Sequence, residues 1–294
     1  MNVDDFNLLA KLIRDRSGLT LTKDKGYLLE SRLLPVARQY TLKTLEELVM
    51  KLRSRPDNAL IRDVVEAMTT NESFFFRDIK PFDQFKTVVL PHLMTAKAAT
   101  RTIKIWSAAC SSGQEPYSLA MILKEEKAKL AGWNIDIVAT DLSTQILQKA
   151  QAGQYAQFEV QRGLPIQLLV KHFTRSGEFW QIAPELRAMV RYRQINLLTD
   201  FSNLGTFDIV FCRNVLIYFD AETKTDVLNR IARVTASDGY LVLGAAETVV
   251  GLTNRFKMVA DRRGLYMPNL DTPRPSILDG VRTAPRLVAI QGGR

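Results

Sequence analysis

Cysteine and histidine are scarce in this sequence of 294 residues. Cys110 and Cys212 both lie in strongly apolar stretches, so we expect reduced thiols rather than a disulfide framework. His92 and His172 have no Cys or His neighbours at the spacing of metal ligands. The sequence therefore predicts neither a disulfide-stabilised fold nor a metal site.

Long hydrophobic runs are missing as well. No apolar stretch approaches the roughly 20 residues that span a bilayer. The opening residues MNVDDFNLLA are acidic and amphipathic, unlike a secretory signal. The length suits two compact domains, and 46% hydrophobic residues are ample for buried cores. We therefore expect a globular protein located in the cytoplasm.

Acidic residues are fewer than basic ones, and the net charge is +9. Such an excess favours an acidic partner, such as nucleic acid, an anionic membrane or an acidic protein surface. A surface that is basic only for solubility explains the charge equally well. Charge alone therefore does not identify the partner.

Only helical patterns occur in residues 1–75, which we predict to be a small helical domain. Apolar residues recur there at helical spacing in four stretches, which begin near Phe6, Tyr27, Leu45 and Leu60. Basic side chains gather on the polar faces of the second and third stretches: Arg32, Arg38, Lys43, Lys51, Arg53 and Arg55. They form either an ordinary exposed face or a docking patch for an acidic helix. The interleaved aromatic residues typical of single-stranded nucleic-acid binders are almost absent.

From about residue 100 the pattern changes to short β-branched runs that alternate with helical stretches. We predict strands at 103–106, 135–140, 207–211 and 240–244, and helices at 117–130, 144–152 and 224–235. This alternation is typical of an α/β fold with a parallel, doubly wound sheet, here over residues 100–268. Residues 76–99 are expected to form a linker helix, residues 173–195 a small antiparallel β insertion, and residues 269–294 a flexible tail.

The segment IWSAACSSGQEPYSLAMIL, residues 105–123, joins a predicted strand to a predicted helix. Gly113 in this turn would let the backbone approach a ligand closely, and the helix N-terminus would point its amide groups at that ligand. The segment has neither a G-x-G-x-x-G fingerprint nor the Lys-Ser/Thr pair of a phosphate loop. Asp141 ends the next strand, where a carboxylate can accept both ribose hydroxyls of an adenosine cofactor. Its alternative role is to cap the helix that follows Ser143.

Five motifs follow one another in the chain: MTTNESFFFRD (68–78), SAACSSGQEPYSLAM (107–121), IVATDLS (137–143), INLL (195–198) and FDIVFCRNVLIYFD (207–220). Together they resemble the chemotaxis receptor glutamate methyltransferases of the CheR family, from about residue 5 to residue 268. The resemblance implies a Rossmann-like S-adenosylmethionine-dependent methyltransferase domain that follows a small all-α domain. It also implies that glutamate side chains in acidic, coiled-coil receptor helices accept the methyl group.

The resemblance implies roles for the matching polar positions. Asn71 and Ser73 would lie against the cofactor, Arg77 would bind its carboxylate, Glu115 its amino group and Asp141 its ribose. Asn196 and Leu197 would flank the adenine, while Arg213 and Asn214 would close the pocket. Two alternatives stay open. Arg77 could instead pair with Asp78 or Asp83, and Glu115 could simply favour the helix dipole.

Some positions depart from the family pattern. Ser73 stands where Thr is common, Ala109 and Gln114 stand where Gly and Glu are expected, and the segment Gly244-Ala-Ala-Glu247 replaces a Gly-His-Ser-Glu type segment. These changes bear on local contacts rather than on the class of cofactor. The lost negative charge at Gln114 would slightly weaken the binding of a cationic cofactor.

A glutamate acceptor has an unperturbed pKa of about 4.3 and is ionised at neutral pH, so no general base is required. The enzyme's task is to hold the reacting atoms in line and away from water. Tyr218 is a candidate for orienting the acceptor, although a packing role is as good an interpretation. Arg32, Arg38 and Arg53 are hypothesised to attract the receptor. Two alternative functions remain, a nucleic-acid methyltransferase and an inactive S-adenosylmethionine-binding regulator.

Overall fold

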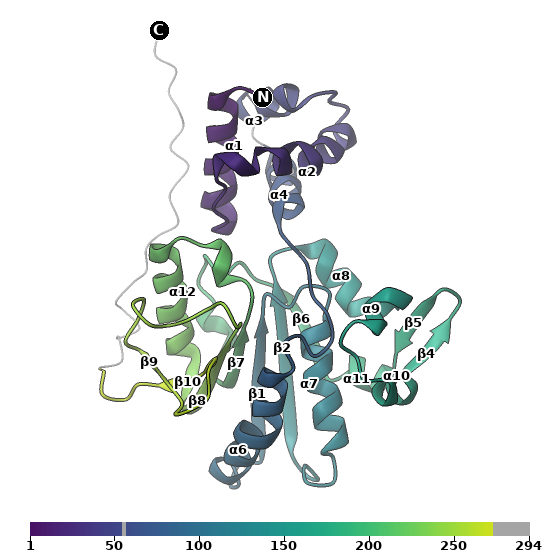
Figure 1. Ribbon diagram of the computed structural model, residues 1–294, viewed down its shortest axis with the longest axis vertical. Coiled ribbons are helices and arrows are strands. Elements are labelled where there is room, and N and C mark those ends of the chain that lie inside the picture. The colour runs from purple at the N-terminus through teal and green to yellow at the C-terminus, as the bar shows by residue number, and fades with distance from the viewer. Residues whose placement is uncertain (55–56, 273–294) are drawn as a thin grey trace.

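The computed structural model describes residues 1–54 and 57–272. Its N-terminal part consists of the helices α1 (Val3–Ser17), η1 (Lys23–Lys25), α2 (Gly26–Gln39), α3 (Leu45–Ser54) and α4 (Asn58–Met68). The apolar stripes of these helices pack against one another around a core that includes Leu9, Leu33 and Leu48. Figure 1 shows this bundle standing above one edge of the large sheet.

The segment after the bundle is not helical at once. Residues 69–73 belong to no helix or strand, and Phe76, Asp78 and Ile79 then have positive φ angles between 50° and 69°. Because non-glycine residues rarely adopt this conformation, the chain turns sharply here. A helical rod follows as α5 (Lys80–Gln84), the π-helical η2 (Phe85–Val89) and α6 (Leu90–Ala96). The expected linker helix over 76–99 therefore begins only at Lys80.

Seven strands form the large sheet: β1 (Thr102–Ala108), β2 (Asn134–Asp141), β6 (Val190–Gln194), β7 (Phe207–Cys212), β8 (Thr235–Leu243), β9 (Phe256–Met258) and β10 (Leu265–Pro268). Their order is β6-β2-β1-β7-β8-β10-β9. The first five are parallel, and β10 is antiparallel to both of its neighbours. The predicted α/β class with a parallel sheet is confirmed, extended by an antiparallel strand.

Helices cover both faces of this sheet. Alternate residues of β1 point to opposite sides, so that Ile105 joins a core with Phe85, whereas Trp106 joins a core with Leu228. The first face is covered by the α5–α6 rod and α7 (Gln114–Glu125), together with α8 (Thr144–Ala152). The second face is covered by α12 (Ala221–Val234). The short helices η3 (Ser202–Leu204) and η4 (Leu216–Tyr218) lie on either side of β7 in the chain.

A second, three-stranded antiparallel sheet lies beside the large one (Figure 1). It contains β3 (Gln154–Ala156), β4 (Phe173–Ser176) and β5 (Phe179–Ile182), in the order β3-β5-β4, with the short helices α9 (Gln157–Gln161), α10 (Ile166–His172) and α11 (Pro184–Arg187). The insertion expected over 173–195 thus differs from the structure at both ends. The small sheet also contains β3, which lies before residue 173. The strand β6, which was expected within the insertion, pairs with β2 and belongs to the large parallel sheet.

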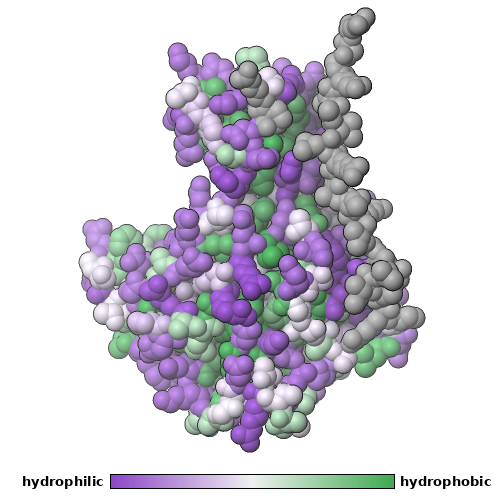
Figure 2. Space-filling model, turned by 180° about the vertical axis from the view of Figure 1, so that it is seen from behind, coloured by the Kyte–Doolittle hydropathy of each residue, from purple (hydrophilic) through white to green (hydrophobic). Residues whose placement is uncertain are grey.

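Some expectations concern residues outside the ranges that the structure describes. Arg55 and nearly all of the expected tail, residues 273–294, lie outside them. Within the described part of the chain, no helix is long and apolar enough to cross a membrane. Seen from behind, the helical bundle is largely hydrophilic on its surface and is joined to the larger part by a narrower waist (Figure 2).

Candidate functional site

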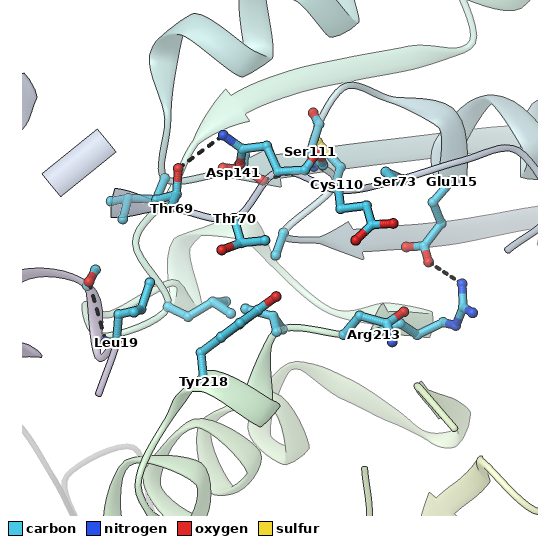
Figure 3. Close-up of a pocket in the computed structure, with 18 of the residues that line it drawn as sticks. Leu19, Thr69, Thr70, Ser73, Cys110, Ser111, Glu115, Asp141, Arg213 and Tyr218 are labelled. Carbon is cyan, nitrogen blue, oxygen red and sulfur yellow. Dashed lines mark hydrogen bonds and ion pairs between the residues drawn. The ribbon is translucent and has the colours of Figure 1, made fainter. Parts of the chain in front are cut away.

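A cavity opens between the helical bundle and the carboxyl edge of the large sheet. It holds about 930 Å³ of empty space, its mouth to solvent included. The sequence-predicted residues that line it are Asn71, Ser73, Arg77, Glu115, Asp141, Asn196, Leu197, Arg213, Asn214 and Tyr218. Residues from five separate segments therefore meet in one place, as Figure 3 shows for several of them.

Gly113 does not line this cavity. Its φ of 91° is left-handed, and a Cβ atom there would lie 2.8 Å from the Tyr192 hydroxyl and 3.0 Å from the Ala150 side chain. Glycine is thus required for the turn and for close packing on the side away from the cavity. The residues of this turn that line the cavity are instead Ala109, Cys110 and Ser111.

Asp141 is buried at the carboxyl end of β2. One carboxylate oxygen accepts a hydrogen bond from the backbone amide of Ser111 (2.9 Å), and the other accepts one from the amide of Ser143 (3.0 Å). Burial raises the pKa of Asp141 above its ordinary value, and the nearby Glu66 carboxylate also raises it. The residue that caps α8 is Ser143, whose hydroxyl accepts from the Ile146 amide, so the capping alternative for Asp141 is wrong.

Glu115 and Arg213 form an ion pair inside the cavity wall. The Arg213 side chain is 1% exposed and donates to the Glu115 carboxylate at 2.8 Å (Figure 3). It also donates to the Asp78 carboxylate and to the Arg77 carbonyl. The other Glu115 oxygen accepts from the Ser107 hydroxyl at 2.8 Å. Two carboxylates therefore share one buried guanidinium, and of the two only Glu115 lines the cavity.

Arg77 supplies a positive charge nearby. Its guanidinium donates to the Glu72 carbonyl and lies 5.5 Å from the centre of the Phe74 ring. Asp78 pairs with Arg213 rather than with Arg77, so the alternative pairing of Arg77 with Asp78 is not observed. The Arg77 guanidinium and the Glu115 carboxylate thus line one cavity, as the zwitterionic end of an amino acid would require.

The segment that leaves the helical bundle forms part of the wall. The Asn71 side chain donates to the Thr69 hydroxyl at 3.0 Å, and the Asn71 carbonyl accepts from the Ser111 hydroxyl at 2.9 Å. Ser73, Thr69 and Thr70 also face the cavity. The two threonines were not predicted, because Thr residues beside a helix end carry no distinctive sequence signal.

Asn196 and Leu197 come from the loop after β6. The Asn196 amide donates to the Arg16 carbonyl at the end of α1 (2.6 Å), and Leu197 is buried. Ser17 and Leu19, which follow Arg16 in the chain, line the cavity as well. The end of the first helix therefore contributes to the site. The sequence did not predict this contribution, because these residues lie almost 180 positions from Asn196 in the chain.

Glu66 joins the two parts of the molecule. This buried carboxylate of α4 accepts hydrogen bonds from the hydroxyls of Ser143 (2.8 Å) and Thr144 (2.9 Å) at the start of α8. A negative charge at a helix N-terminus is favourable because the amide groups there point outward. Glu66 thus fixes the helical bundle close to Asp141.

Neither cysteine is placed to act as a nucleophile. Burial raises the pKa of both the Cys110 and the Cys212 thiols well above the usual range, so both stay protonated at neutral pH. Residues 1–54 and 57–272 contain no group of three or more His, Cys, Asp or Glu side chains that could hold a metal ion. Most of the polar side chains that line the cavity carry hydroxyl, amide, carboxylate or guanidinium groups.

Comparison with known families accounts for both parts of the chain. Residues 4–69 match the family model described as "CheR methyltransferase, all-alpha domain", and residues 71–265 match "CheR methyltransferase, SAM binding domain". The chain belongs to the CheR methyltransferase family. The resemblance of the five motifs is thereby confirmed, and with it S-adenosylmethionine as the cofactor and methyl transfer as the activity.

Curated relatives share nearly the whole length. "Chemotaxis protein methyltransferase 1" of Pseudomonas aeruginosa is 44% identical over 265 residues, which are 89% of this chain and 96% of the relative. "Chemotaxis protein methyltransferase Cher2" of Pseudomonas putida is 41% identical with the same coverage. "Chemotaxis protein methyltransferase" of Vibrio parahaemolyticus is 38% identical, covering 89% of this chain and 95% of that protein.

The structure explains the places where this CheR family member departs from the expected pattern. Ala109 has a φ of 55°, a conformation in which glycine would be free of strain. Gln114 is buried, does not line the cavity and accepts from the Ser112 hydroxyl. The expected weakening of cofactor binding through the missing charge at Gln114 stays a prediction.

The three arginines expected to dock a CheR substrate have different surroundings. Arg32 donates to the carbonyls of Met68 and Thr69 and so anchors the end of α4. Arg53 pairs with the buried Asp5 at 3.0 Å. Arg38 is exposed on α2. Only Arg38 can therefore be altered without disturbing a contact that the structure records within the bundle.

Proposed function

We propose that the cavity binds S-adenosylmethionine through the residues expected from the sequence. The support is the placement of Arg77, Glu115 and Asp141 on one cavity, with charges that match the carboxylate, the amino group and the ribose. The other proposed contacts are Asn71, Ser73, Asn196, Leu197, Arg213 and Asn214, while Gly113 shapes the turn behind them. Asp141 would accept ribose hydroxyls with lone pairs that its two backbone donors leave free.

The proposed acceptor is the carboxylate of a glutamate side chain in a chemotaxis receptor. The names of the relatives refer to chemotaxis, and the carboxylate chemistry fits a cavity without an activated nucleophile. When bound, the cofactor supplies an activated methyl group. The acceptor carboxylate oxygen would take this methyl group from the cofactor's sulfur, which would keep the electron pair of the broken bond.

The protein's part in this reaction would be to align the reacting groups. Positioning of this kind can contribute about 7 to 11 kcal/mol to lowering the barrier. Tyr218 extends from η4 into the cavity (Figure 3) and is our candidate for orienting the acceptor. A phenolic hydroxyl can donate one hydrogen bond to a carboxylate without neutralising it.

The receptor segment would be an acidic, coiled-coil helix on the cytoplasmic side of the membrane. The net charge of +9 and the basic residues of α2 and α3 support an electrostatic attraction to it. Arg32, Arg38 and Arg53 are the proposed contacts. Association should then weaken as ionic strength rises, because exposed charges are screened over about 8 to 10 Å.

Incubation with methyl-labelled S-adenosylmethionine and isolated receptor tests the proposal. The expected result is label on receptor glutamates that base releases, as for a methyl ester. Label on DNA or RNA instead would identify a nucleic-acid methyltransferase. Binding of S-adenosylhomocysteine without transfer to any of these acceptors would identify a regulator without this activity.

A further inference from the structure

Glu247 lies outside the cavity but contacts the backbone of a loop that lines it. Its carboxylate is buried and accepts four hydrogen bonds, all from backbone amides. One oxygen accepts from Asn214 (2.8 Å) and Gly244 (2.7 Å), and the other accepts from Val215 (3.0 Å) and Leu216 (2.8 Å). Three consecutive amides of the loop after β7 therefore converge on one side chain.

The sheet brings these two loops together. Strands β7 and β8 are parallel neighbours, with Cys212 opposite Leu243, so both chains leave the sheet at the same edge. Asn214 has a φ of 59° and interrupts regular hydrogen bonding just after β7. Without Glu247, the amides of this loop would lack partners in a part of the molecule where burial makes unpaired donors costly.

The loop held in this way carries two polar residues of the site. Asn214 and Tyr218 both line the cavity, at the beginning and the end of the loop. At its far end, the Tyr218 carbonyl accepts from the Thr20 amide of the helical bundle at 2.9 Å. Glu247 thus fixes the end nearer the sheet, while the bundle holds the other.

We propose that Glu247 is a positioning residue for methyl transfer. Its carboxylate sets the path of the loop from Asn214 to Tyr218, so that Asn214 meets the cofactor and Tyr218 faces the acceptor. The part that concerns Tyr218 rests on the function proposed above. Small displacements of such groups have large effects on rate, because alignment of the reacting atoms is the main contribution of the protein.

Gly244 supports the same assignment from the other side. A Cβ atom there would lie 2.7 Å from the Glu247 carboxylate and 2.9 Å from the Asn214 side-chain amide. The two residues between them, Ala245 and Ala246, are exposed. The segment therefore departs from the family pattern only at the exposed Ala245 and Ala246. Gly244 and Glu247, which contact the loop, match that pattern.

The variant Glu247→Gln tests this role, because it keeps the size of the side chain but turns one acceptor oxygen into an amide donor. We expect kcat for receptor methylation to fall about tenfold or more, and the Kd for S-adenosylhomocysteine to rise about threefold. The matched control is Asp208→Asn. Asp208 is a buried carboxylate at the opposite end of β7 that accepts from the Lys104 amide, so its loss lowers Tm without affecting kcat or Kd.

If Glu247→Gln does not fold, Gly244→Ala displaces the same carboxylate and should lower kcat in the same direction. A kcat and a Kd within about twofold of wild type in the folded variant would overturn the proposal, as would equal losses in Asp208→Asn. Absence of receptor methylation by the wild-type protein would instead refute the proposed acceptor. In that case the Kd for S-adenosylhomocysteine, compared among these variants, still decides the role of Glu247.

Discussion

Arginine has different surroundings in the cavity and on the helical bundle. Arg213 is almost completely buried and donates to two carboxylates and a carbonyl, so its position is fixed. Arg38 is exposed on α2 and is free to adapt to a partner. If the proposed function is correct, this chain separates binding of a small, defined ligand from recognition of a large, charged surface. The comparison predicts large effects of substitutions in the first region and small, salt-dependent effects in the second.

Arg213→Ala should have the largest effect. It leaves Glu115 and Asp78 as unpaired carboxylates, and removal of one partner from a buried ion pair costs about 3 to 5 kcal/mol. We expect a loss of this size in the free energy of unfolding, measured with urea, and loss of S-adenosylhomocysteine binding. The control is Arg191→Ala, because Arg191 forms an exposed pair with Asp136 that contributes at most about 1 kcal/mol. Equal effects of the two variants would contradict the distinction between buried and exposed arginines.

Glu66→Gln tests whether the two regions are coupled. We expect a loss of about 1 to 3 kcal/mol in stability, because the hydroxyls of Ser143 and Thr144 lose a charged acceptor. The affinity for S-adenosylhomocysteine should also fall, as Asp141 lies beside this contact. Glu159→Gln is the control, since Glu159 accepts from the Ala156 amide within the small sheet region, away from the cavity. Unchanged affinity in Glu66→Gln would show that the bundle and the cavity are independent.

The pH dependence of cofactor binding should report on Asp141. Burial raises the pKa of this carboxyl, and ribose hydroxyls need its ionised form as acceptor. Affinity should therefore be complete above the raised pKa and fall up to about tenfold per pH unit below it, starting at a higher pH than for an ordinary Asp with pKa near 3.9. Titration calorimetry with S-adenosylhomocysteine at several pH values measures this. Persistence of the same pH dependence in Asp141→Asn would assign it to another group.

Arg38→Glu should have the smallest effect. We expect KM for the receptor to rise a few-fold at low salt and the difference to vanish at high salt, with kcat and cofactor affinity unchanged. Lys127→Glu provides the same change of charge on an exposed residue after α7, at the far end of the sheet. A rise in KM that is equal in both variants would mean that only the net charge matters, and that α2 has no specific role in docking.

The sequence was most informative where a property is local. Short β-branched runs that alternate with helical stretches placed β1, β2, β7 and β8 and the helices between them, because strands buried on both faces of a sheet are apolar along their length. The end of β2 predicted Asp141, since strand ends at one edge of a parallel sheet meet in space, whereas most of the other cavity residues came from the resemblance of the five motifs. The 173–195 region was placed less well, because short strands of two different sheets carry the same period of two.

Contacts between distant segments could not be predicted in this way. The pairing of Arg213 with Asp78 and the contact of Glu66 with Ser143 join residues that lie far apart in the chain. Hydrogen bonds from backbone amides could not be predicted either, because the Ser111 and Asn214 amides donate to carboxylates whatever side chains these residues carry. Gly113 carried the clearest local signal, yet its side of the turn faces α8 rather than the cavity.

A crystal structure with S-adenosylhomocysteine tests most directly the claim that the cavity beneath the helical bundle is the cofactor site. We predict ribose hydroxyls on the Asp141 carboxylate, the amino group near Glu115 and the carboxylate near Arg77. The adenine should lie between the loop at Asn196 and the end of α1. An adenosine bound elsewhere, or bound in the cavity without contact to Asp141, would contradict the account.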